Sequence, residues 1–263
     1  MENLTLLKIG GNVIDNLLLL DRVLQDFAKW EGPKTLVHGG GKLASDLMKK
    51  MGIMPKMVNG RRITDRDTLD IVTMVYAGLI NKNIIASLQK YTCNAIGLSG
   101  ADANIIPAQK RPVRDVDYGY VGDIDTKDID GEQLSRFIGS GLTPVMAPIT
   151  HDGQGSLLNT NADTIASGVA IALAGYYKVC LVFCFEKKGV LRDPSDEDSV
   201  IDFLDEKLFD QYKDEGIITA GMIPKLENAF AALHNGVDEI RICSPEGVSS
   251  GQTGGTRIRI GNK

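Results

Sequence analysis

Short apolar runs that alternate with longer helical patterns constrain the fold of this chain more than any other feature. Residues 4–9 and 35–37 are predicted to be buried strands, and each run is followed by glycines and then by a helical pattern. Such alternation is typical of α/β architecture with a mainly parallel sheet. With 263 residues, of which 43% are hydrophobic, the chain can bury a sizeable core.

The remaining elements follow from the same periodicities and from proline and glycine signals. We expect strands at residues 95–98, 144–149, 179–185 and 239–243, a hairpin at 113–124, and helices from residue 12 onward and at 43–51, 161–174, 204–212 and 224–235. Residues 175–178 follow a complete unit and precede a fresh strand. They predict a boundary between an N-terminal lobe, 1–175, and a C-terminal lobe, 176–263.

Charge and cysteine usage narrow the class of protein. The formal net charge of −5 argues against nucleic acid as the main partner, because phosphate backbones are usually bound by a surplus of basic residues. Cys180 and Cys184 fall inside an apolar run, so we interpret them as buried hydrophobes and expect no metal site. No stretch reaches the roughly 18 consecutive apolar residues of a membrane span. These features predict a cytoplasmic enzyme with reduced thiols and no membrane partner.

Two predicted strands end in glycine clusters that lead directly into helices, at Gly10-Gly11 and at Gly39-Gly40-Gly41. The start of a helix exposes unpaired backbone N–H groups and the positive end of the helix dipole. Glycine lets this backbone approach an anion closely, because no side chain intervenes. Two such junctions in neighbouring units, each near a lysine, predict a cradle for phosphate oxygens.

The second cluster also fits a dinucleotide-binding template, because residues 39–44 match G-x-G-x-x-G/A between a strand and a helix. The template expects an acidic residue about 20 positions later, where the sequence carries Arg61 and Arg62 instead. The two arginines would favour a 2′-phosphate, so an NADP-dependent oxidoreductase stays open as an alternative. A Walker A loop is excluded, because leucine follows Gly41-Lys42.

A set of short motifs occurs in a fixed order along nearly the whole chain. The motifs are Lys8-Ile9-Gly10-Gly11, His38-Gly39-Gly40-Gly41, Arg62-Ile63-Thr64-Asp65, Ala77-Gly78-Leu79-Ile80-Asn81-Lys82, Leu98-Ser99-Gly100-Ala101-Asp102, Asn159-Thr160-Asn161-Ala162-Asp163, Ala220-Gly221-Met222-Ile223-Pro224-Lys225 and Gly255-Thr256. In this order they resemble the amino-acid kinase family, and within it the N-acetylglutamate kinases. Any one motif is weak evidence, whereas the ordered set is specific.

This resemblance implies an open three-layer αβα sandwich with a mainly parallel central sheet and two lobes. The N-terminal lobe would bind the acceptor and form the dimer contact, and the C-terminal lobe would bind ATP with Mg²⁺. The implied reaction transfers the γ-phosphoryl group of ATP to the γ-carboxylate of N-acetyl-L-glutamate, in arginine biosynthesis. Since that carboxylate is already ionised at neutral pH, no general base is required.

The resemblance also implies which residues carry the reaction. Lys8 and Lys225 match the family's two catalytic lysines, which compensate the charge of the moving phosphoryl group. Asp163 matches the acid that holds both lysines in place. Gly11 and Gly40 would donate backbone N–H groups to the same oxygens, as an oxyanion hole does.

Binding residues are implied in the same way. For the acceptor they are Gly40, Gly41, Arg62 and Asn159, and the planar fork of the arginine suits a carboxylate. For the nucleotide they are Lys8, Gly10, Glu186, Gly189, Leu191, Ile217, Thr219 and Lys225. His38 is interpreted as a structural hydrogen-bonding residue rather than an acid or base.

Some positions depart from the family pattern. The family usually carries Thr or Ser followed by Asp at the start of the nucleotide lobe, where this chain has Phe185-Glu186 and so lacks the hydroxyl. Lys42 and Arg61 stand where uncharged residues are usual. The added cations suggest an acceptor with a further carboxylate, such as N-succinyl-L-glutamate; the alternative is that both side chains reach solvent.

Other functions stay open beside the leading one. A related kinase could act on aspartate, glutamate, carbamate or UMP, and a non-catalytic amino-acid sensor could keep the same fold. The presence of Lys8, Asp163 and Lys225 speaks against the sensor. Arginine-inhibited family members use an additional N-terminal helix for hexamer assembly, whereas the first motif here begins a few residues from Met1. We therefore expect a homodimer that is insensitive to arginine.

Overall fold

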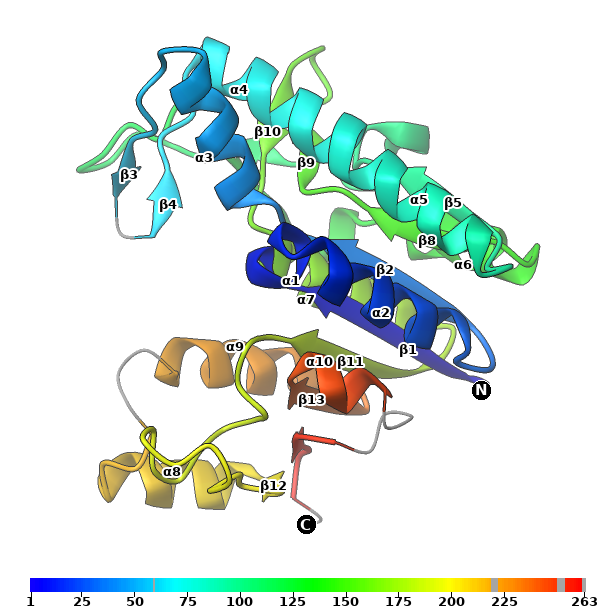
Figure 1. Ribbon diagram of the computed structural model, residues 1–263, viewed down its shortest axis with the longest axis vertical. Helices are drawn as coiled ribbons and strands as arrows, with labels where there is room; N and C mark the ends of the chain where they lie inside the picture. The colour runs from blue at the N-terminus through cyan, green and yellow to red at the C-terminus, as the bar shows by residue number, and fades with distance from the viewer. Residues whose placement is uncertain (59, 219–221, 250–253, 262–263) are drawn as a thin grey trace.

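An eight-stranded sheet runs through the molecule in the order β12-β14-β13-β11-β1-β2-β8-β5 (Figure 1). The computed structural model describes residues 1–58, 60–218, 222–249 and 254–261. The strands of this sheet are β1 (Asn3–Ile9), β2 (Lys34–His38), β5 (Ala95–Leu98), β8 (Thr143–Met146), β11 (Lys178–Cys184), β12 (Phe203–Leu204), β13 (Glu239–Cys243) and β14 (Thr256–Ile258). Neighbouring strands pair in parallel except β13 and β14, which are antiparallel.

Three small antiparallel sheets and the helices complete the described structure. The small sheets pair β3 (Met57–Val58) with β4 (Arg61–Arg62), β6 (Gln109–Lys110) with β7 (Gly122–Asp123), and β9 (Ile149–His151) with β10 (Leu157–Asn159). The helices are α1 (Gly11–Asp15), α2 (Leu17–Ala28), α3 (Gly41–Lys50), α4 (Arg66–Thr73), α5 (Asn81–Lys90), α6 (Gly131–Gly139), α7 (Ala162–Leu173), α8 (Glu206–Asp214), α9 (Ile223–His234) and α10 (Pro245–Ser249), with a π-helix η1 (Met74–Ile80) and 3₁₀ turns η2 (Asp102–Asn104) and η3 (Thr126–Asp128).

Helices cover both faces of the large sheet, which confirms the expected three-layer αβα sandwich. On one face α7 packs against β1, β2 and β11, with α6 against β8 and α9 against β13. On the other face α2 packs against α5 and α10, and α5 packs against β5 and β8. In Figure 1 β1, α1 and α2 lie in the middle of the view, α3, α4 and α5 above them, and the C-terminal elements, from β12 and α8 onward, below.

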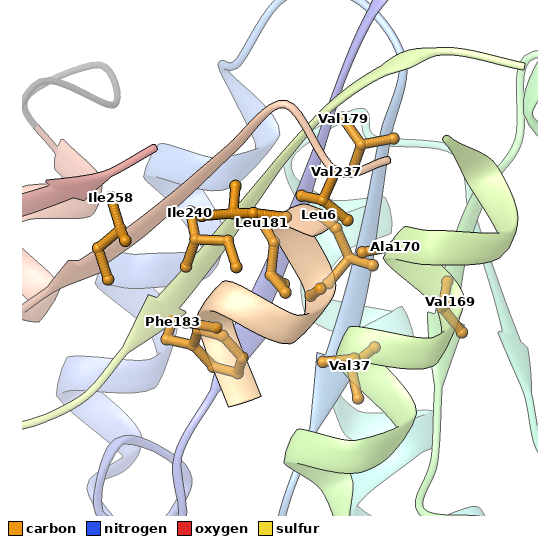
Figure 2. Packing of buried hydrophobic residues seen from close by; sticks show 14 of the residues in the cluster. Leu6, Val37, Val169, Ala170, Val179, Leu181, Phe183, Val237, Ile240 and Ile258 are labelled. Carbon is orange, nitrogen blue, oxygen red and sulfur yellow. The ribbon is translucent and has the colours of Figure 1, made fainter. Parts of the chain in front are cut away.

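The two helical layers enclose two hydrophobic cores, one on each face of the sheet. Alternate residues of β1 divide between them, with Leu6 in one core and Leu7 in the other. A parallel strand that is buried on both faces reads as a continuous apolar run, and β1 does. Figure 2 shows the first core, where Leu6 and Leu181 lie close to Ala170 of α7. Each core contains residues from before and after residue 175, and the predicted lobe boundary stays a prediction.

Some predicted elements have different limits in the structure. The run 144–149 was predicted as one strand, which is wrong: β8 ends at Met146, and β9 begins at Ile149 in a different sheet. Pro148 between them has no N–H to continue a ladder. The helix expected from residue 12 is two helices, because the Asn16 side chain accepts a hydrogen bond from Leu19 and starts α2 afresh.

Two further limits differ. Leu204 belongs to strand β12, and the helix expected from this residue begins at Glu206, capped by Asp205. The hairpin expected at residues 113–124 is mostly the loop that joins β6 to β7. Leu204 pairs with Ile258 of β14, and Gly119 and Val121 form single bridges with Thr64 and Asn159. Local patterns do not reveal such distant pairings.

One long helical stretch, Arg66–Lys90, comprises α4, η1 and α5 and has 25 residues. By length and composition alone it is the one stretch among the described residues that could cross a membrane. Its buried side chains, which include Val72, Ile84 and Leu88, belong to the core beside α2 and the sheet. We therefore interpret this stretch as a core helix.

Candidate active site

Parallel pairing brings three strand ends to one edge of the sheet. Ile9, the last residue of β1, pairs with His38 of β2 and with Cys184 of β11, so the loops after these strands lie side by side. The N–H of Gly39 donates to the carbonyl of Ile9 at 3.2 Å, and a Cβ added to Gly39 would lie 3.8 Å from the backbone nitrogen of Gly11. The two glycine loops predicted to share a cradle are therefore in contact.

Lys8 and Asp163 form an ion pair at this edge. Lys8 on β1 is only 6% exposed, and its Nζ lies 2.6 Å from Oδ1 of Asp163. The first turn of α7 holds the acid in place, because the Asn161 side chain accepts hydrogen bonds from the N–H groups of Asp163 and Thr164. Among the described residues Asp163 makes no ion pair with Lys225, although the resemblance implied that it would hold both lysines.

A cavity of about 430 Å³ opens between the first glycine loop and the loops of the C-terminal part. It is lined by every described residue that was predicted to bind nucleotide: Lys8, Gly10, Glu186, Gly189, Leu191, Ile217 and Lys225. Gly11 lines it as well. Thr219 lies outside the described residues. Two lysine side chains therefore line a partly apolar cavity, an arrangement suited to a nucleotide and its phosphates.

Glu186 is fixed at the wall of this cavity. Its carboxylate accepts a hydrogen bond from the side chain of Asn12, a residue of α1 that also lines the cavity. The two lysines that follow are engaged elsewhere, because Lys187 pairs with Glu197 at 3.1 Å and Lys188 pairs with an acid of the same loop. The substitution of the usual Thr/Ser-Asp pair therefore leaves one acid pointing across the cavity toward α1.

A second cavity, of about 500 Å³, is lined by the second glycine loop, Gly39-Gly40-Gly41. The predicted acceptor-binding residues Gly40, Gly41, Arg62 and Asn159 all line it. Gly40 has a φ of +146°, and a Cβ there would lie 2.2 Å from Cδ1 of Ile80. Only glycine fits this position, because both the backbone conformation and the space exclude a side chain.

Hydrogen bonds hold the polar groups of the second cavity. Arg62 is 7% exposed, and its Nη2 donates to the carbonyl of Gly41 at 2.8 Å and to Oγ of Ser45 at 2.7 Å. Asn159 Nδ2 donates to Oγ1 of Thr64 at 3.0 Å. Tyr76 on η1 lines the cavity too, and burial raises the pKa of its phenol, so that the hydroxyl keeps its proton at neutral pH.

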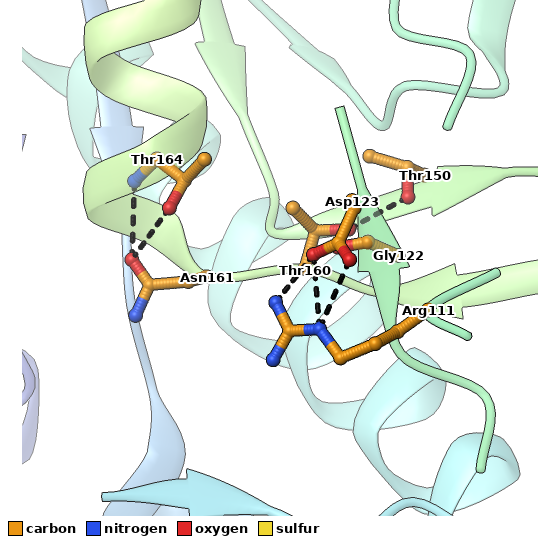
Figure 3. Close-up of polar contacts among 7 residues, drawn as sticks. All are labelled: Arg111, Gly122, Asp123, Thr150, Thr160, Asn161 and Thr164. Atoms are coloured by element: carbon orange, nitrogen blue, oxygen red, sulfur yellow. Dashed lines mark hydrogen bonds and ion pairs between the residues drawn. The ribbon is translucent and has the colours of Figure 1, made fainter. Parts of the chain in front are cut away.

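One side of this cavity carries further charged groups. Figure 3 shows the guanidinium of Arg111 turned toward the carboxylate of Asp123, with hydrogen bonds from Nε of 3.0 Å to each oxygen. Arg61, one of the two unusual cations, also lines the cavity. Lys42, the other, is 66% exposed at its side chain and lies 3.9 Å from Asp15. Of the two added cations, only Arg61 borders the acceptor cavity.

His38 has the structural role that the sequence suggested. Its Nδ1 donates to the carbonyl of Gly39 at 2.9 Å, and its Nε2 accepts from the side chain of Asn81 at 3.2 Å. Burial lowers the pKa of this imidazole to about 4, so the ring is neutral at pH 7. All four cysteines are free, and burial raises the pKa of the Cys180 thiol to about 12, which leaves it protonated.

Sequence reasoning missed three residues of the site. Asn12 directly follows the first glycine pair, and that position was a signal that could have found it. Tyr76 lies within the π-helix, a distortion that is frequent at functional sites but has no simple sequence signature. For Phe185 the sequence showed only that the hydroxyl usual in the family is missing. In the structure its ring lines the first cavity beside Lys8 and Lys225.

Comparisons with known proteins agree with this geometry. The model of the amino acid kinase family matches residues 3–244. An acetylglutamate kinase of Bacteroides fragilis is 54% identical over 258 residues, covering 98% of this chain and 97% of that protein. One from Cytophaga hutchinsonii is 52% identical over 263 residues, covering 98% and 99%. A crystal structure from Streptococcus mutans has a TM-score of 0.76 at 29% identity, covering 98% of this chain and 99% of that one.

Proposed function

The chain belongs to the amino acid kinase family, and on this premise we propose that it is an acetylglutamate kinase that works in arginine biosynthesis. It transfers the γ-phosphoryl group of ATP to the γ-carboxylate of N-acetyl-L-glutamate and yields an acyl phosphate and ADP. Relatives of this name match nearly the full length of the chain at 52–54% identity. They favour this reaction over the other amino-acid kinases, the NADP-dependent oxidoreductase and the sensor.

One observation carries the proposal: one glycine loop lines the nucleotide-type cavity, the other lines the acceptor-type cavity, and the two loops are in contact. Gly11 lines the first cavity and Gly40 lines the second. A phosphoryl group that passes from one cavity to the other must cross this junction. The backbone N–H groups of Gly11 and Gly40 would then donate to its oxygens during transfer.

The chemistry needs positioning and charge compensation rather than a nucleophilic side chain. An oxygen of the acceptor carboxylate forms a bond to the γ-phosphorus while the bond from that phosphorus to the bridging oxygen of ADP breaks. Lys8 and Lys225 offset the negative charge spread over the phosphoryl oxygens. Asp163 keeps the Lys8 ammonium at the junction through the 2.6 Å ion pair.

The second cavity has the groups that an acylated glutamate needs. Arg62 would engage the α-carboxylate through its planar fork, exchanging its present hydrogen bond to Ser45 for the ligand. Asn159 would hydrogen-bond the acylamino group, and the protonated phenol of Tyr76 offers one more donor beside Gly41. These groups leave the γ-carboxylate free to face the glycine loops.

The lining of the first cavity fits a magnesium ion carried by the nucleotide. Mg²⁺ commonly takes one or two carboxylates together with phosphate oxygens and water, and Glu186 is the one carboxylate among the described lining residues. When bound, the ion would neutralise charge on the β- and γ-phosphates. No group of three or more metal-ligating side chains occurs in the described part of the chain, so the phosphates and water would supply most ligands.

The assay that tests this proposal traps acyl phosphate with hydroxylamine in the presence of ATP and Mg²⁺. N-acetyl-L-glutamate is compared with free glutamate, aspartate, carbamate and UMP, each at equal concentration. We expect hydroxamate with the acetylated acceptor and none with free glutamate or aspartate. Hydroxamate from a free amino acid alone, or phosphorylation of UMP alone, would contradict the proposed substrate.

A second candidate acceptor, N-succinyl-L-glutamate, is favoured by a specific observation. Arg61 and Arg111 both border the acceptor cavity and a neighbouring cavity of about 380 Å³ that also contains Arg114. Arg111 is paired with Asp123, so a carboxylate on the acyl group would meet Arg61 and Arg114 there. The same hydroxylamine assay with both acyl glutamates decides this point, and a strong preference for the acetyl compound removes the succinyl alternative.

We also propose the organisation that the family resemblance suggested. The N-terminal lobe, 1–175, holds the acceptor cavity and the dimer contact, and the C-terminal lobe, 176–263, provides most of the nucleotide cavity. A homodimer is supported by Met74 and Leu79, large apolar side chains that are 54% and 51% exposed on the long helix. Light scattering with and without arginine tests the assembly. A cytoplasmic location is in keeping with four free cysteines.

A further inference from the structure

Phe185 lies against both lysines that the proposed reaction uses. The Nζ of Lys8 lies 4.9 Å from the centroid of its ring, and the Nζ of Lys225 lies 4.5 Å from it. Both distances fall within the roughly 6 Å over which the face of an aromatic ring attracts a cation. Lys225 forms no ion pair with a carboxylate among the described residues, and its ammonium contacts the ring of Phe185 instead.

The surroundings of the ring fix it in this place. The N–H of Phe185 donates to the carbonyl of Cys243 at 2.9 Å, which anchors the backbone to the end of β13. The ring of Phe183 stacks on it, with centroids 5.8 Å apart and an interplanar angle of 3°. A Cβ added to Gly10 would lie 3.7 Å from Cδ1 of Phe185. The ring is therefore held against the first glycine loop.

The ring also separates two cavities. Phe185 and Lys225 line the nucleotide cavity and, in addition, a cavity of about 390 Å³ between α7 and α9. A smaller side chain at this position would join the two spaces. Lys225, in the first turn of α9, borders both spaces and would then lose the ring that its ammonium contacts.

We propose that Phe185 is a positioning residue, whose aromatic face holds the ammonium groups of Lys8 and Lys225 toward the transferring phosphoryl group. The expected effect on phosphoryl transfer rests on the proposed kinase activity, whereas the contact of the ring with the two ammonium groups does not. A carboxylate in the same place would form a directed ion pair that competes with the phosphate. A ring attracts the cations less directionally, so each ammonium can turn to the phosphate without losing a hydrogen bond.

The decisive experiment changes the electrons of the ring and keeps its shape. Phenylalanine with one, two and three ring fluorines is incorporated at position 185, since fluorine withdraws charge from the ring face. The kcat for acyl phosphate formation should fall stepwise, by roughly tenfold in total, with a smaller change in KM for the acceptor. The same series at Phe203, whose ring faces Arg257 at 5.7 Å on the outer strands, is the matched control and should leave kcat unchanged.

Two substitutions with natural amino acids test the same effect on kcat. Phe185→Leu should lower kcat about as much as full fluorination, and Phe185→Tyr should keep kcat within about threefold of the unmodified enzyme, because the ring is retained. Thermal unfolding of each variant separates a fall in stability from a fall in kcat. A kcat that is independent of fluorination, or equal in the Leu and Tyr variants, would overturn the proposal.

A second measurement, which needs no catalysis, uses NMR to test the ring–ammonium contact separately from the proposed function. In the free enzyme, the ε-methylene protons of Lys8 and Lys225 should resonate upfield of ordinary lysines, because they lie over an aromatic ring. Phe185→Leu should return both signals to the ordinary position, and Lys8→Arg and Lys225→Arg assign them. Ordinary shifts in the unmodified enzyme would refute the contact. Upfield shifts in a protein inactive with every acceptor would retain the contact and refute the kinase proposal alone.

Discussion

At the scale of single residues, the two lysines of the site depend on different neighbours. Lys8 is buried and has Asp163 at 2.6 Å, whereas Lys225 is exposed and has the ring of Phe185. A carboxylate that close fixes the position of a cation, and a displacement of about 1 Å at a reacting centre can cost about 100-fold in rate. We therefore expect loss of the negative charge of Asp163 to lower the reaction rate strongly.

Asp163→Asn tests this dependence, because the amide keeps the shape of the side chain and removes its charge. We expect kcat to fall about 100-fold, with a smaller change in KM for ATP. Steady-state kinetics give both constants. Asp210→Asn, on the exposed side of α8, is the control and should behave as the unmodified enzyme. A kcat for Asp163→Asn close to that of the control would show that the ion pair does not serve the reaction.

Arg62→Lys tests recognition of the acceptor. Lysine keeps the positive charge but cannot engage both oxygens of a carboxylate. The KM for N-acetyl-L-glutamate should rise about tenfold or more, while the KM for ATP stays nearly constant. Arg136→Lys, at a surface ion pair of α6, provides a matched control. If instead the KM for ATP rises and that for the acceptor does not, Arg62 has been assigned to the wrong ligand.

At the scale of elements, strand–glycine–helix junctions could be read from the sequence because each is a local event. Predicting the end of β1 before Gly10 and the start of a helix after the second glycine cluster required only periodicity and glycine chemistry. The break at Pro148 was missed, because the apolar pattern runs through it and only tertiary pairing puts β8 and β9 in different sheets. The contact of Lys8 with Asp163 likewise joins distant segments, so the family motifs, not local pattern, were needed to suggest it.

The second glycine junction yields a prediction about an element as a whole. Gly40→Ala would place a Cβ 2.2 Å from Cδ1 of Ile80 at a φ of +146°, so either the Ile80 side chain or the start of α3 must shift. We expect kcat/KM to fall about 100-fold and the free energy of unfolding to fall by about 1–2 kcal/mol. Kinetics and urea denaturation measure the two effects.

Gly139→Ala serves as the control for that variant, because this glycine ends α6 with open space around its Cβ position. Alanine is the better helix former, so stability should stay equal or rise slightly. An active Gly40→Ala enzyme with unchanged stability would mean that the loop tolerates a side chain. The second glycine loop would then not need to approach the phosphoryl group as closely as proposed.

At the scale of the whole molecule, the buried His38 links stability to pH. Its pKa is about 4 in the folded state and near 6.5 in an unfolded chain. As the pH falls below about 6.5, His38 becomes protonated in the unfolded state but stays neutral in the folded state. The contribution of His38 to stability is therefore present above this pH and is lost on acidification. The loss due to this residue amounts to about 2 kcal/mol between pH 7 and about pH 5.

His38→Gln isolates that contribution, because other groups titrate equally in both proteins. Glutamine at this position cannot gain a proton, so the stability gap between the two proteins should narrow by about 2 kcal/mol over the same pH range. Urea denaturation at each pH supplies the free energies. A gap that is constant with pH would mean that the imidazole is not held neutral in the fold.

Phosphoryl transfer also involves the whole molecule, since it requires both cavities and the junction between them. ³¹P spectra of the enzyme with ATP, Mg²⁺ and N-acetyl-L-glutamate follow the phosphoryl group directly. We predict a new acyl phosphate signal that grows in step with ADP and is absent for Lys8→Met. Formation of ADP and inorganic phosphate without acyl phosphate, or no loss of ATP at all, would contradict the account.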